Sequence, residues 1–234
     1  MVKRTGCGPV RYFFTIGLHP FYALVLLSVI TAIGVATTWA EPKELDAGLG
    51  MILFTQMFLA SSGFVTRARR GHFDPVLVDH ARRIRASAAH CLVSVLPGVT
   101  AWLLLASVAA IVRAPAALSA FAGSRAAALT IVSALSWAAG FWLPRGAAGM
   151  LWMALLMLLV LQRAELLAVP AGSGGVVSLA IHAATLTVCP FLLLGQHPPL
   201  APGAVAAAMV LPVLLVWSMW RQSRTLDVYL VDPS

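Results

Sequence analysis

Charged residues are scarce in this sequence. Asp, Glu, Lys and Arg together make up 10% of its 234 residues, against about 25% in an ordinary soluble protein. Hydrophobic residues make up 60%, and the mean hydropathy is +0.91. So few charges cannot cover the surface of a soluble domain of this length. The composition therefore predicts one transmembrane domain over residues 1–234, with lipid as its main solvent.

Lysines are also scarce, and no two cysteines lie close together in the sequence. Lys3 and Lys43 are the only lysines, and neither follows the Gly-rich loop of a P-loop ATPase. Cys7, Cys91 and Cys189 are far apart and form no CxxC or Cys/His pattern, which argues against a disulfide framework and a metal site. A G-x-S-x-G nucleophile motif is missing as well. We therefore predict a chain that is not an enzyme, with no catalytic residues and no metal ligands.

The net charge of +8 is unevenly distributed. Most of it comes from arginines that lie beside apolar runs, above all at positions 67, 69, 70, 82, 83 and 85. Arginines in such places are typical of the cytoplasmic flanks of membrane helices. The charge therefore predicts contact with a lipid bilayer, and it does not predict binding to nucleic acid.

Six apolar runs are long enough to cross a bilayer. They cover residues 21–39, 49–65, 91–112, 126–143, 148–168 and 204–220. A seventh run, 176–194, is ambiguous because it holds His182 and Pro190. If it crossed, Arg221 and Arg224 would move to the outer side, against the positive-inside rule. We therefore predict an all-α fold of about six spans with both termini cytoplasmic, and a re-entrant or interfacial helical hairpin at 169–202 on the outer side.

The most informative segment is the cytoplasmic connection at residues 66–90. Asp74 is a good N-cap, Pro75 fits the first helical position, and Phe73 and Val78 stand at the staple positions. A short helix is therefore expected from Pro75 toward Ile84. Two interpretations remain open: a connector held to anionic lipid by arginine, or a docking helix that enters a cleft on a cytoplasmic partner.

A resemblance bears on this choice. The sequence Arg69-Arg70-Gly71-His72-Phe73-Asp74-Pro75-Val76-Leu77 directly follows the second span. It resembles the coupling segment of type-2 ABC exporter permeases, in which RRGTLELLL or RRGTFDLLL is typical. His72 stands in place of the common Thr, and Pro75 and Val76 stand in place of Leu, so this would be a divergent member. The layout is also similar: a basic amphipathic segment at 1–19, a short acidic outer loop, the coupling segment, and an outer hairpin before the last span.

The resemblance implies a permease subunit of an ATP-binding-cassette transporter in the bacterial plasma (inner) membrane. ATP and Mg would be bound by a separate P-loop ATPase chain, and this chain would bind no cofactor. A second permease copy or a paralogue would complete the transporter. The residues expected to dock on the ATPase are Arg69, Arg70, Phe73, Asp74, Pro75, Leu77, Arg82 and Arg83.

Polar residues within the predicted second span suggest a candidate substrate path. They are Gln56, Ser61 and Ser62, for which close helix packing is the competing interpretation. Two other functions remain open. His19, His90 and His182 would serve a haem-handling or redox membrane protein, although no pair has ligand spacing on one helix. A structural subunit that transports nothing is the third.

Overall fold

The computed structural model describes residues 11–13, 42–61, 63–71, 73, 80–113, 124–144, 146–155, 157, 175–194 and 202–225. In these ranges the only regular secondary structure is helical, which confirms the all-α prediction for them. The named elements are α3 Pro42–Ala60, α4 Phe64–Arg69, α6 His80–Arg113, α8 Ser124–Trp142, α10 Val176–Val188, the 3-10 helix η1 Pro190–Leu194 and α11 Pro202–Gln222. A further apolar helix covers Gly146–Leu155. The predicted first span, residues 21–39, lies outside the described residues.

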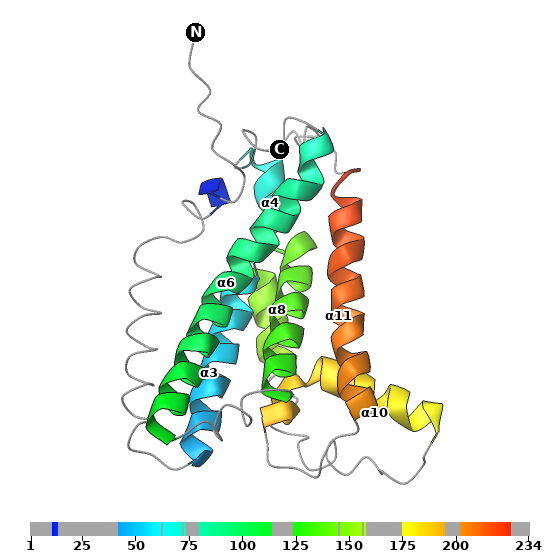
Figure 1. Ribbon diagram of the computed structural model, residues 1–234. Coiled ribbons are helices and arrows are strands. Elements are labelled where there is room, and N and C mark those ends of the chain that lie inside the picture. The colour runs from blue at the N-terminus through cyan, green and yellow to red at the C-terminus, as the bar shows by residue number, and fades with distance from the viewer. Residues whose placement is uncertain are drawn as a thin grey trace.

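Several of the described helices run in a common direction. α3, α6, α8 and α11 lie side by side along one direction, and α10 lies across one end of them (Figure 1). We call this the hairpin end. The opposite end holds α4, the start of α6 and the last turn of α11, and we call it the basic end (Figure 1).

Within the part of the chain that the structure describes, two helices are long and apolar enough to cross a bilayer, Arg83–Val108 and Gly203–Gln222. They overlap the predicted third and sixth spans. Only 22% of the apolar window in Gly203–Gln222 is buried within the chain. A core helix of a soluble protein would be mostly buried, whereas this helix presents Val210, Leu211 and Leu214 outward, each more than half exposed.

The predicted second span, 49–65, is not one continuous helix. α3 ends at Ala60 and α4 begins at Phe64, and Gly63 between them has φ 60° and ψ 45°. Glycine adopts this left-handed conformation without the steric cost that a Cβ brings. The sequence pattern missed the break because Phe64 and Val65 continue the apolar run across it.

The sequence predicts a short helix from Pro75 toward Ile84 that is separate from the third span. Instead, α6 runs without interruption from His80 to Arg113. Alanines at 81, 86, 88 and 89 favour a helix throughout this stretch, so nothing separates the end of the connection from the span. Asp74, Pro75 and Leu77 lie outside the described residues.

The ambiguous run 176–194 folds as two short helices with a break at Cys189. Pro190 disfavours the helical conformation for the residue before it, and Cys189 has φ −124° and ψ 65°. α10 lies across the ends of the long helices rather than beside them (Figure 1). α11 then runs back toward the basic end (Figure 1). The outer hairpin at 169–202 and the number of spans stay predictions.

Candidate functional site: the basic end of the bundle

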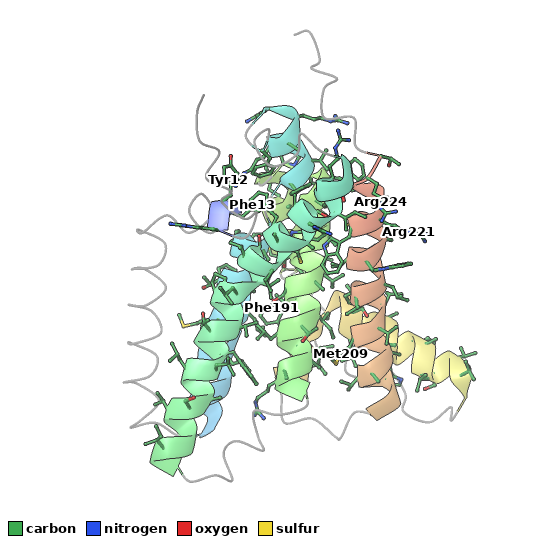
Figure 2. The ribbon with its side chains drawn as sticks, turned by 45° about the horizontal axis from the view of Figure 1, so that its top comes forward. Tyr12, Phe13, Phe191, Met209, Arg221 and Arg224 are labelled. Carbon is green, nitrogen blue, oxygen red and sulfur yellow. The ribbon has the colours of Figure 1, made fainter. Side chains whose placement is uncertain are left out.

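The basic end gathers arginines from three elements. Arg69 belongs to α4 and Arg70 is its C-cap. Arg85 belongs to the start of α6, Arg221 belongs to the last turn of α11, and Arg224 lies in the turn just after α11. All five are exposed. Figure 2 shows Arg221 and Arg224 side by side at the end of α11. These side chains present a cationic surface to whatever covers this end.

A buried contact holds the end of α11 against α6. The hydroxyl oxygens of Ser87 and Ser223 lie 3.1 Å apart, and either can donate the hydrogen bond. Both residues are almost fully buried. The contact joins positions 136 residues apart in sequence, so the arginines of α11 are held in place relative to those of α6.

Beneath this surface lies an aromatic cluster, which we define as Phe13, Phe64, Phe73, His90 and Trp137. The His90 ring lies 5.1 Å from those of Phe13 and Phe64 and 5.5 Å from that of Phe73, measured between ring centroids. Trp137 Nε1 donates a hydrogen bond to His90 Nδ1 over 3.3 Å. Since Nδ1 accepts, the imidazole carries its proton on Nε2 and is neutral. His90 is thus part of the packing of α4, α6 and α8.

Two residues predicted to contact the ATPase are not on the surface. Phe73 is 1% exposed and belongs to the aromatic cluster, and Arg83 is 2% exposed. Their side chains pack inside this chain, which corrects the sequence-based assignment of both. Arg69 and Arg70 are exposed. Arg82 lies in α6, but its side chain lies outside the described residues.

A signal for the burial of Phe73 was present in the sequence. A residue at the position before an N-cap commonly packs against apolar side chains, and Phe73 holds that position before Asp74. Arg83 carried no such signal, because the burial of an arginine depends on neighbours that the local sequence does not reveal.

Two of the three residues of the candidate substrate path are buried between helices. Gln56 is fully buried on α3, and its Nε2 donates to the backbone oxygens of Ser94 at 3.1 Å and Val95 at 3.4 Å. Ser61 is also fully buried, and its hydroxyl donates to the Met57 carbonyl. Ser62 lies outside the described residues. Gln56 and Ser61 therefore serve helix packing in this conformation.

The described histidines do not come together. His182 Nδ1 lies 2.8 Å from the Ser178 carbonyl oxygen in α10, at the hairpin end, whereas His90 lies in the aromatic cluster. No group of three or more His, Cys, Asp or Glu side chains among the described residues could hold a metal ion. His19 lies outside these residues.

A small cavity of about 10 Å³ lies between the helix Gly146–Leu155 and the hairpin. Its lining includes Met57, Trp152 and Cys189. A volume of this size holds one water molecule, so the cavity is no substrate site.

No protein-family model, curated protein or solved structure matches this chain.

Proposed function

We propose that this chain is the membrane-spanning permease subunit of an ATP-binding-cassette exporter. In this proposal about six helices cross a bacterial inner membrane, and a separate P-loop ATPase chain binds and hydrolyses ATP. The observation that carries the proposal is the attachment of the motif-bearing segment. It leaves α4 at Arg69 and Arg70, turns at Gly71, and inserts Phe73 into the aromatic cluster.

This attachment suggests how motion would pass from the partner to the spans. The Phe73 ring lies 5.1 Å from that of Phe13 and 5.4 Å from that of Phe64, and His90 and Trp137 bring α6 and α8 into the same cluster. A force on the segment 69–77 would therefore act on three helices at once. ATP-driven closure of the partner could drive transport only if its contacts differ between the two states.

The distribution of charge supports a cytoplasmic basic end. Among the described residues this end holds nine arginines, at positions 11, 67, 69, 70, 82, 83, 85, 221 and 224. The hairpin end holds two, Arg113 at the end of α6 and Arg125 at the start of α8. Positive residues are retained on the cytoplasmic side of membrane proteins. The hairpin would then face outward, and the ATPase would meet the basic end.

We assign two roles to the predicted docking residues, according to their exposure. Exposed Arg69 and Arg70 would contact the ATPase, and buried Phe73 would transmit its movement to the helices. Asp74, Pro75, Leu77 and Arg82 remain predicted contacts. The proposal therefore separates binding from coupling, and a pair of variants can test this separation.

The experiment is to purify the tagged full-length chain from native membranes, identify any P-loop ATPase that accompanies it, and measure ATP hydrolysis by the complex. We expect Arg69→Gln with Arg70→Gln to release the ATPase. Phe73→Ala should keep the ATPase bound but lose stimulation of hydrolysis. Arg113→Gln, at the hairpin end, is the matched charge control and should change neither. A wild-type chain that retains no P-loop ATPase would refute the proposal.

A further inference from the structure

One exposed face of α11 has a graded composition along its length. Val210, Leu214, Trp217 and Arg221 follow one another in α11 at intervals of four, three and four residues, and Arg224 follows three residues later in the turn after Gln222. Residues at this spacing share one face of a helix. Val210 and Leu214 are each 54% exposed and Trp217 is 53% exposed, and both arginines are exposed. The face thus changes from aliphatic to aromatic to cationic as α11 approaches the basic end.

The distances along this face match the layers of a bilayer. Arg221 lies seven positions after Leu214, which corresponds to about 10 Å at 1.5 Å per residue. Each polar layer of a bilayer is about 5–8 Å thick, from a hydrocarbon core of about 30 Å and a total of about 40–45 Å. With Leu214 in hydrocarbon, Trp217 would lie at the boundary and Arg221 among the phosphates.

The two key side chains are already in contact. The Arg221 guanidinium carbon lies 5.4 Å from the centre of the Trp217 ring, within the range of a cation–π interaction. Stacking on the indole restricts the guanidinium and keeps it at the depth of the ring. The planar guanidinium can then form two parallel hydrogen bonds with phosphate oxygens. Arg224 adds a second positive charge one turn away.

We propose that Trp217, Arg221 and Arg224 form a binding site for the headgroup of an anionic phospholipid. The occupant is a lipid phosphate that carries net negative charge, because two positive groups face it and a zwitterionic headgroup would bring its own cation. The site requires only that α11 lies in a bilayer. It does not depend on an ATPase partner, and it uses none of the residues assigned to ATPase docking.

The test is binding of lipid by the full chain in nanodiscs. Discs are prepared with phosphatidylcholine alone or with added phosphatidylglycerol, and retained lipid is counted by native mass spectrometry after release into detergent. We expect preferential retention of phosphatidylglycerol. Each arginine should contribute roughly fivefold and the pair about thirtyfold, so Arg221→Gln with Arg224→Gln should remove most of the preference. Arg113→Gln should leave it unchanged.

Three further measurements complete the test. Arg221→Lys should keep part of the preference, because the charge remains without the bidentate geometry. Trp217→Leu should weaken retention although no charge is lost. Inorganic phosphate added to the detergent-solubilised chain should not raise its melting temperature. The proposal is overturned if the double variant still prefers phosphatidylglycerol, if phosphatidylcholine is retained equally well, or if free phosphate alone stabilises the wild type.

Discussion

At the scale of single residues, Gln56 and Gly98 pack closely against each other. A Cβ built on Gly98 would lie 2.5 Å from Gln56 Cδ and 2.9 Å from Gln56 Cγ. Both distances are too short for a non-bonded contact of a Cβ atom. Only glycine at 98 leaves room for this amide. Gln56 in turn donates to the carbonyls of Ser94 and Val95, just before Pro97 inside α6. Proline removes one helical hydrogen bond and weakens the helix locally. The Gln56 amide adds hydrogen bonds from α3 in the turn just before this proline.

Replacement of Gly98 by Ala should therefore destabilise the protein. The new methyl group would displace Gln56, with loss of its two hydrogen bonds, and we expect the free energy of unfolding to fall by about 1–3 kcal/mol. Denaturant unfolding of the detergent-solubilised chain would measure this. In the Gln56→Ala background the same change should lower the free energy of unfolding much less, because the Gln56 side chain that clashes with the new methyl group is missing. Equal costs in both backgrounds would contradict the contact.

At the scale of elements, the break between α3 and α4 determines the direction of the segment that follows. Gly63 turns the chain through its left-handed conformation, and the Arg67 backbone nitrogen donates to the Gly63 oxygen over 3.0 Å. α4 then carries Phe64 into the aromatic cluster. Without this break, the apolar run would continue straight and the coupling-like segment would start elsewhere.

Gly63→Ala should lower the free energy of unfolding by about 1–2 kcal/mol, because an L-residue in the left-handed helical conformation meets a steric cost that glycine avoids. Gly146→Ala is the matched control. A Cβ at Gly146 meets nothing within 4 Å, so this change should be neutral or should stabilise the helix that begins there. Unfolding midpoints of the two variants would be compared under identical conditions. A stabilised Gly63→Ala protein would mean that α3 and α4 form one helix.

The comparison of sequence with structure is also clearest for the elements. Apolar runs predicted α8 and α11 within two residues at each end, because these helices start and stop where the hydropathy changes. α6 begins at His80, before the predicted start of the third span at residue 91. Arginine and alanine form helix as readily as leucine does, and hydropathy does not detect this. The burial of Phe73 depends on Phe13, which is distant in sequence, and on Phe64 and His90. Such contacts were beyond a reading of the local segment.

At the scale of the whole molecule, the two ends differ in charge and in construction. The basic end is closed by an aromatic cluster under exposed arginines, and the hairpin end is covered by α10 and η1. α11 joins the two ends: it starts next to the hairpin and finishes beside α6 at the Ser87–Ser223 contact. If the bundle lies in a membrane with the basic end in the cytoplasm, the two ends of α11 must be accessible from opposite sides.

Single cysteines at the two ends test this arrangement. Gly175→Cys lies just before α10 at an exposed position where a Cβ meets nothing within 4 Å, and Arg224→Cys lies at an exposed position beyond α11. With Cys7 replaced by Ser, the remaining native cysteines are buried, Cys91 at 8% and Cys189 at 3% exposed. Burial also raises the pKa of the Cys189 thiol, which keeps it in its unreactive protonated form.

A membrane-impermeant maleimide applied to intact spheroplasts should label Gly175→Cys at once and Arg224→Cys only after the membrane is permeabilised. The reason is that, in the proposed six-span arrangement, α11 alone crosses the membrane between the two positions. In a seven-span protein the run 176–194 would also cross, so two crossings would separate the two positions and both cysteines would lie on the outer side. Labelling of both from outside would therefore contradict the six-span arrangement, because either the run 176–194 crosses as well or α11 does not cross.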